Sequence, residues 1–147
     1  MNKIENEFVP YQIALALKEL GFDEPCFAGY NFKDGRTGQF TYPSAREPNT
    51  TSEARVYHND KKIVGAPLYQ QAFKFFRERY RFQNILWSGK INTIFYGYDI
   101  LHIDEQKFIL NNSENGGGDC DYDTYEEAEL ACVVKLIDIV KKQNLKG

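Results

Sequence analysis

Aspartates stand at alternate positions from Asp119 to Asp123, directly after three consecutive glycines, and this spacing could hold a metal ion. Carboxylate oxygens in a loop are the ligands that a hard cation such as Ca²⁺ prefers. The EF-hand pattern fails here, because Thr124 occupies the position that needs glycine and Leu130 the position that needs glutamate. We therefore expect neither a metal nor another cofactor in this chain.

The same acidic residues could instead stabilise a helix or bind a partner protein. Negative charge at a helix N-terminus is favourable by about 0.3 to 1 kcal/mol per residue, and exposed carboxylates can also attract a basic surface on another molecule. Two tyrosines beside a long expected loop add aromatic surface. The expected partner-binding residues are Asp119, Asp121, Asp123, Glu126, Glu127, Tyr42 and Tyr57.

Cations alternate with aromatic residues in the segment FKFFRERYRF (73–82). This combination can bind single-stranded nucleic acid through phosphate contacts and base stacking. On a helix, however, Phe73, Phe76 and Tyr80 would form one buried stripe, and a separate basic stripe would face solvent without any need for nucleic acid. The nucleic-acid-binding alternative would use Lys74, Arg77, Arg79 and Arg81.

Cys120 could be a nucleophile with His58 or His102 as its base, since a reactive thiolate needs a nearby imidazole. Aspartates flank Cys120, however, and negative charge raises a thiol pKa and suppresses its reactivity. His102, Asp104 and Glu105 offer too few ligand types to distinguish a metal site from a polar turn. Because the sequence also lacks GxSxG, HExxH, GxGxxG and CxxC motifs, we expect no enzyme, although isolated residues could still assemble a catalytic site.

Three helices and several short strands are expected to position these residues. The helices are predicted over 10–20, 67–80 and 124–140, where apolar residues recur on one face. Thr124 and Glu127 form a capping box at the start of the last helix. Strands are predicted at 26–32, 39–42, 85–87, 94–102 and 107–110, with a small pairing of 56–57 and 63–64 and with turns at 33–35, 88–90 and 104–106.

Short connections between strands favour antiparallel pairing, and amphipathic helices need a sheet face to cover. We therefore predict an α+β fold, a two-layer sandwich in which three helices cover a mainly antiparallel sheet of about four to five strands. The length of 147 residues fits a single domain over residues 1–147.

The net charge of −3 and the isoelectric point near 5.4 give no overall attraction for a polyanion. Three cysteines without a CxxC spacing fit free thiols in a reducing compartment. The sequence starts without an apolar run that could serve as a signal peptide, and no stretch is apolar for long enough to span a membrane. These features predict a cytoplasmic protein that does not enter a membrane.

Three segments, which together cover about a third of the chain, carry a resemblance to a known group of proteins. They are FVPYQIALALKELGFDEPCF (8–27), APLYQQAFKFFRERY (66–80) and TYEEAELACVVKLIDIVK (124–141). The chain resembles a family of small, largely uncharacterised proteins of phages and mobile elements of Bacteroidetes-type bacteria. This resemblance implies a mobile-element setting, in which small proteins often bind larger ones, and it implies no catalytic residue.

We therefore expect a non-enzymatic protein that binds a larger host or element protein, for example a nuclease complex, in the manner of an anti-CRISPR inhibitor. The alternative is an accessory protein that binds nucleic acid through the basic face of the second helix.

Overall fold

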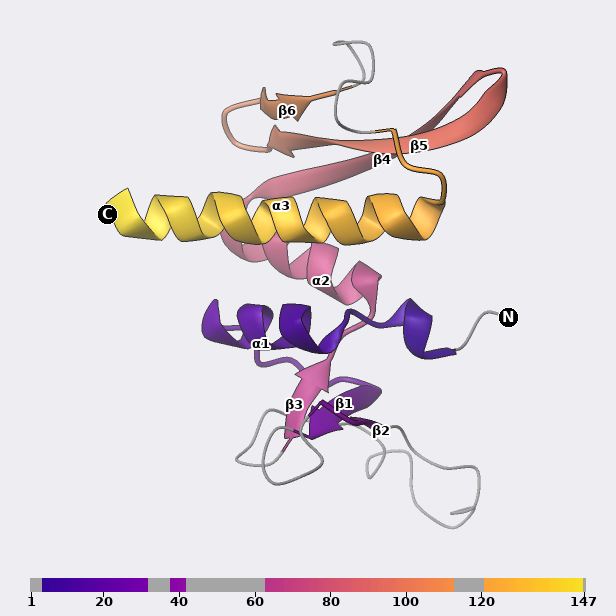
Figure 1. Cartoon of the computed structure of the whole chain (residues 1–147). Coiled ribbons are helices and arrows are strands. Elements are labelled where there is room, and N and C mark those ends of the chain that lie inside the picture. The colour runs from indigo at the N-terminus through magenta and orange to yellow at the C-terminus, as the bar shows by residue number, and fades with distance from the viewer. Residues whose placement is uncertain (1–3, 32–37, 42–62, 113–120, 147) are drawn as a thin grey trace. The chain divides into compact units, whose positions relative to one another are not determined.

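The computed structural model describes residues 4–31, 38–41, 63–112 and 121–146 (Figure 1). The chain divides into two compact units, Met1–Ala72 and Phe73–Gly147. The helical elements are the 3₁₀-helix η1 (Ile4–Glu7), the α-helices α1 (Tyr11–Glu19), α2 (Tyr69–Phe75) and α3 (Tyr125–Lys146), and the π-helix η3 (Phe76–Tyr80). The strands are β1 (Ala28–Asn31), β2 (Phe40–Thr41), β3 (Ile63–Ala66), β4 (Phe82–Ile91), β5 (Thr93–His102) and β6 (Lys107–Asn111).

The first unit contains an antiparallel sheet with the strand order β2-β1-β3. Its central strand β1 carries Tyr30, whose hydroxyl donates a hydrogen bond of 2.8 Å to the carbonyl of Val9. The Tyr30 ring contacts the rings of Tyr11 and Phe40 edge-on, and Phe40 also contacts Phe8. These aromatic side chains join the sheet to the segment that leads into α1.

The predicted first helix is confirmed as α1, and its two ends have the expected causes. Pro10 is the N-cap, where its missing N–H leaves no hydrogen bond unmade. Gly21 follows the helix with a φ of 100°, which residues other than glycine rarely adopt. Its N–H donates to the carbonyl of Lys18, while the N–H of Phe22 donates to the carbonyl of Leu17, so the last carbonyls of the helix are satisfied.

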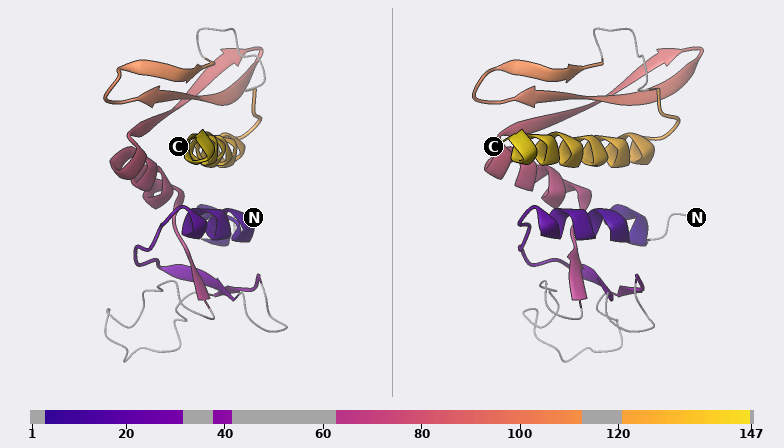
Figure 2. Two further views of the ribbon diagram at one scale, coloured as in Figure 1. Left: turned by 90° about the vertical axis from the view of Figure 1, so that its left-hand side faces the viewer. Right: turned by 60° about the vertical axis from the view of Figure 1, so that its left-hand side comes forward.

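The second unit contains an antiparallel sheet with the order β4-β5-β6, and α3 packs against β5 and β4. Figure 1 and Figure 2 both show α3 running along one face of this sheet, so that the unit has a helical layer and a sheet layer. Tyr98 and Ile100 of β5 are buried, and so is Phe82 of β4, which shares their face. The buried residues of α3 are Ala128, Glu129, Cys132, Val133, Leu136, Ile137 and Val140.

The predicted α+β class, the antiparallel pairing and the three α-helices are confirmed, whereas the predicted strand count is too low. The described residues form six strands in two sheets, instead of four to five strands in one. Part of the difference comes from Ile63–Ala66, which is a full strand paired with β1. The predicted partner of that strand, residues 56–57, lies outside the described residues.

The turn predicted at 88–90 is wrong, because these residues belong to β4 and pair with β5. The chain reverses two residues beyond the predicted turn, at Asn92, whose φ is 68°. Gly89 is needed inside the strand, since a Cβ atom there would lie 2.5 Å from Cζ of Phe95, its partner in β5. The glycine that suggested a turn therefore makes room for an aromatic ring.

Candidate functional site

A backbone bridge joins the start of α3 to the middle of β5. The N–H of Tyr122 donates to the carbonyl of Tyr96, and the N–H of Tyr96 donates to the carbonyl of Tyr122, both at 2.9 Å. Because β4 occupies the other side of Tyr96, Tyr122 lies on the side of β5 that β6 also uses. The residues that lead into α3 are therefore fixed to the sheet by main-chain hydrogen bonds.

Two pairs of tyrosines reinforce this bridge. The ring of Tyr122 stacks near Tyr98, with centroids 6.4 Å apart, and the ring of Tyr125 meets Tyr96 edge-on at 6.2 Å. Burial raises the pKa of Tyr125, and the nearby carboxylates of Glu129 and Glu126 raise it further. The Tyr125 hydroxyl is therefore a neutral group at physiological pH and can donate a hydrogen bond.

Four of the seven predicted partner-binding residues come together at this place. Asp121, Asp123, Glu126 and Glu127 are exposed around the first turn of α3, and we call them the acidic turn. Among the residues that the structure describes, none of the four forms an ion pair. The remaining three predicted residues, Asp119, Tyr42 and Tyr57, lie outside the described ranges.

The predicted cap orders the acidic turn. The hydroxyl oxygen of Thr124 accepts a hydrogen bond of 3.1 Å from the backbone N–H of Glu127. Negative charge is also favourable beside the exposed N–H groups at the start of a helix. Glu126 and Glu127 therefore lie in the first turn of α3, and Asp121 and Asp123 lie in the bridged segment before it, with all four side chains exposed.

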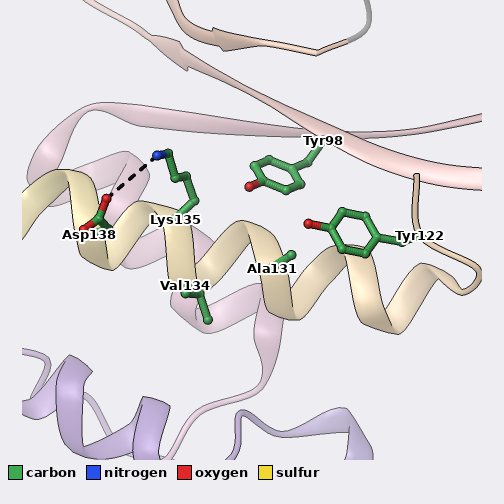
Figure 3. Close-up of a pocket in the computed structure, with 6 residues that line it drawn as sticks. All are labelled: Tyr98, Tyr122, Ala131, Val134, Lys135 and Asp138. Carbon is green, nitrogen blue, oxygen red and sulfur yellow. Dashed lines mark ion pairs between the residues drawn. The ribbon is translucent and has the colours of Figure 1, made fainter. Parts of the chain in front are cut away.

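A pocket of about 400 Å³ lies next to the acidic turn, between β5 and α3. Tyr98 lines it from β5, Tyr122 from the segment that leads into α3, and Ala131, Val134, Lys135 and Asp138 from the helix (Figure 3). The sequence prediction did not include this pocket. Tyr98 and the helical residues are far apart in the sequence, and only the packing of α3 on β5 brings them together.

Asp138, at the helical wall of the pocket, forms ion pairs with two lysines of α3. Lys142 Nζ lies 3.1 Å and Lys135 Nζ 3.8 Å from Oδ2. The hydrogen bond from Lys142, followed by the charges of both lysines, lowers the pKa of Asp138 against the opposing effect of desolvation. Asp138 is therefore ionised at neutral pH.

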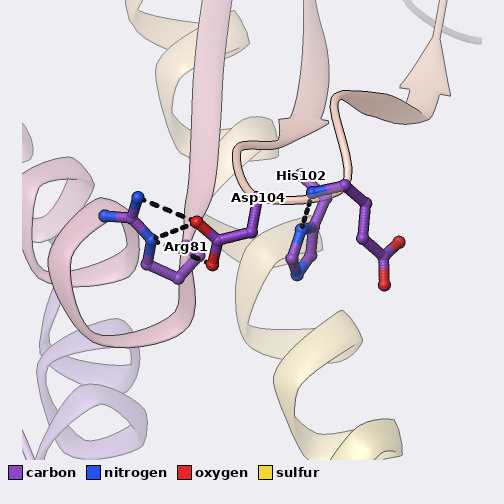
Figure 4. Close-up of polar contacts among 4 residues, drawn as sticks. Arg81, His102 and Asp104 are labelled. Atoms are coloured by element: carbon purple, nitrogen blue, oxygen red, sulfur yellow. Dashed lines mark hydrogen bonds and ion pairs between the residues drawn. The ribbon is translucent and has the colours of Figure 1, made fainter.

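The basic residues of the nucleic-acid alternative are distributed over α2, η3 and the residue after it. Lys74 lies 3.9 Å from Glu78. Nε and Nη2 of Arg81 donate to the carboxylate of Asp104 at 3.0 to 3.2 Å (Figure 4), and Arg79 lies over the ring of Phe75. Two of the four predicted cations are thus already paired with a carboxylate.

His102, Asp104 and Glu105, which were considered as metal ligands, lie at a polar turn. His102 Nδ1 accepts from the backbone N–H of Glu105 at 3.2 Å, while Asp104 is held by Arg81 (Figure 4). Within residues 4–31, 38–41, 63–112 and 121–146, no group of His, Cys, Asp and Glu side chains is arranged to hold a metal. Cys120 and His58 lie outside these ranges.

No family model, curated protein or solved structure matches the chain. The resemblance of its three segments to proteins of phages and mobile elements stays a prediction. None of the helices in the described ranges is long and apolar enough to cross a membrane.

Proposed function

We propose that this chain is a non-enzymatic binding protein of a phage or mobile element, and that it binds a larger protein through the acidic turn. The observation that carries this proposal is that Asp121, Asp123, Glu126 and Glu127 are exposed together and have no ion-pair partner among the described residues. Such a surface attracts a basic surface and can align it before contact. Tyr122 and Tyr125 lie within the same segment and supply aromatic area of the kind that interfaces favour.

A basic surface that binds nucleic acid is the most suitable target for these carboxylates, because they would take the places of phosphate groups. We therefore propose a nuclease complex of a host defence system as the partner, with the chain acting as an anti-CRISPR-like inhibitor. The resemblance of segments 8–27, 66–80 and 124–141 supports the mobile-element setting. Cys26 and Cys132 are buried and form no disulfide among the described residues, which supports action in a reducing compartment, the cytoplasm.

Nucleic-acid binding by the chain itself has less support. Lys74 and Arg81 are engaged by Glu78 and Asp104, and a phosphate would have to compete with these carboxylates. The net charge of −3 also disfavours a polyanion.

Affinity purification from the native host, followed by identification of co-purifying protein and nucleic acid, tests the proposal. A reversal variant carries Asp121→Lys, Asp123→Lys, Glu126→Lys and Glu127→Lys. Its control carries the same change of charge at four exposed carboxylates of the first unit: Glu5→Lys, Glu7→Lys, Glu19→Lys and Asp23→Lys. We expect the reversal variant to lose the partner and the control to keep it.

Retention of the partner by the reversal variant would contradict the proposal, as would purification with nucleic acid alone. Circular dichroism checks that both variants fold. If the lysines unfold the start of α3, an amide variant replaces them. It carries Asp121→Asn, Asp123→Asn, Glu126→Gln and Glu127→Gln, which remove the negative charges without placing positive charge at the helix N-terminus.

A further inference from the structure

The pocket between β5 and α3 brings together hydrogen-bond donors from both elements. Tyr98 and Tyr122 contribute hydroxyl groups, and Lys135 contributes an ammonium group. Figure 3 shows both hydroxyls pointing in the same direction, toward the side of the pocket where Lys135 lies. A ligand group that accepts several hydrogen bonds would therefore find donors from three side chains.

The charges at the helical wall favour an anion. Lys135 and Lys142 share the single carboxylate of Asp138, so these three groups carry a net charge of +1. Lys142 is the closer partner of Asp138, and Lys135 is the more distant one, at 3.8 Å. Lys135 can turn toward a ligand at little cost, because an exposed ion pair contributes little stability.

Apolar surface completes the pocket. Val134 is 47% exposed although it is aliphatic, and it lines the pocket together with Ala131 and the two tyrosine rings. A ligand body placed against Val134 would remove this apolar area from water. The volume of about 400 Å³ lies within the usual range of small-molecule sites, roughly 300 to 1,000 Å³.

We propose that this pocket binds a small organic anion, with a carboxylate or phosphate head group that accepts from Lys135, Tyr98 and Tyr122 and an apolar body that packs on Val134. The head group belongs at the Lys135 end, because Asp121 and Asp123 flank Tyr122 with negative charge at the other end. The pocket shares Tyr122 with the proposed partner surface, but Lys135, Val134 and Tyr98 lie outside the acidic turn, so each proposal can fail without the other.

The test is a titration of the ¹⁵N-labelled full chain, followed by ¹H–¹⁵N correlation spectra. Benzoate and phenyl phosphate are the probes with an apolar body and an anionic head, benzamide is the uncharged counterpart of benzoate, and inorganic phosphate is a head group without a body. We expect benzoate or phenyl phosphate to shift the signals of Tyr98, Tyr122, Ala131, Val134 and Lys135. Benzamide and inorganic phosphate should each bind at least about tenfold more weakly.

Substitutions of Lys135 and Tyr122, with an exposed lysine of α3 as the control, identify the head-group contact. Lys135→Gln should weaken the binding of the anionic probe about tenfold or more, because it removes a charge-assisted hydrogen bond. Lys141→Gln, an exposed lysine of the same helix that does not line the pocket, should leave the affinity within about twofold. Tyr122→Phe keeps the ring and should weaken binding about threefold to tenfold.

Three results would overturn the proposal: equal affinity for benzoate and benzamide, unchanged affinity in Lys135→Gln, or no shift at these residues with either anionic probe at millimolar concentration. A preference between benzoate and phenyl phosphate, with the shifts in place, supports the site and identifies its head group.

Discussion

The indole of Trp87 lies over Gly97, its cross-strand partner in β5, so closely that a Cβ atom on Gly97 would overlap the ring. The indole N–H donates to Asp99 at 3.1 Å, and the ring meets Phe95 edge-on. Phe95 in turn lies over Gly89. Two glycines and two aromatic rings thus form a diagonal arrangement on one face of the hairpin.

We expect Gly97→Ala to destabilise the fold by about 2 kcal/mol, because the methyl group forces the indole away from Asp99, a carboxylate that is only 4% exposed. Urea denaturation followed by tryptophan fluorescence measures the change in unfolding free energy. Ser88→Ala, at an exposed position of the same hairpin, is the control and should change it by less than about 0.5 kcal/mol. An equal effect of both variants would show that the close approach does not matter.

Thr124→Ala should cost about 1 kcal/mol, because the N–H of Glu127 loses its acceptor at the start of α3. Thr124→Ser keeps a hydroxyl and should stay within a few tenths of a kcal/mol of the original chain. Thermal unfolding monitored by circular dichroism compares the three proteins. If serine and alanine were equally destabilising, the hydroxyl would not be the stabilising group.

The Arg81–Asp104 pair makes the stability of the fold decrease at low pH. The hydrogen bond from Arg81 lowers the pKa of Asp104 in the folded chain, with smaller charge effects from Arg81 and His102. The pair therefore stabilises the fold fully at pH values above the pKa of Asp104 in the unfolded chain. This stabilisation is lost below about pH 4, as the pH falls through the lowered pKa of Asp104 in the folded chain.

Carbon-detected NMR titration of the Asp104 carboxyl group measures this shift. Arg81→Gln should return the pKa to the ordinary aspartate range, whereas Lys74→Gln, which removes a cation from a different ion pair, should leave it lowered. An unchanged Asp104 pKa in Arg81→Gln would contradict the assignment.

Cys26 should resist alkylation in the folded chain, because burial, helped by the charge of Glu24, raises its pKa to about 12. Its thiol is then protonated at pH 8, and the stability gained by keeping it protonated is lost only as the pH rises from about 9 toward 12. Iodoacetamide labelling at pH 8, with and without urea, followed by peptide mass spectrometry, measures the protection. Equal labelling rates in the two conditions would contradict it.

Local signals accounted for the parts of the fold that were predicted correctly. Pro10 and Gly21 indicate the two ends of α1, and Thr124 indicates the start of α3, because each acts through a hydrogen bond or a φ angle within a few residues of itself. The acidic turn was predicted for the same reason. Its four described carboxylates are neighbours in the sequence, and they are neighbours in the structure as well.

The features that were missed depend on residues far apart in the chain. Gly89 resembles a turn residue until Phe95 is placed across from it, and β3 becomes a full strand only through its pairing with β1. The pocket requires Tyr98 of β5 and Lys135 of α3 to meet. Periodicity and turn chemistry contain no information about such pairings.

The bridge between Tyr96 and Tyr122 uses only main-chain atoms, so its two hydrogen bonds do not depend on which side chain stands at residue 122. A substitution of Tyr122 would therefore remove the ring contact with Tyr98 and keep the main-chain attachment of the segment that leads into α3. Proline is the exception, because it has no N–H to donate to Tyr96. The anchor of this segment is thus separable from the side chain that lines the pocket beside it.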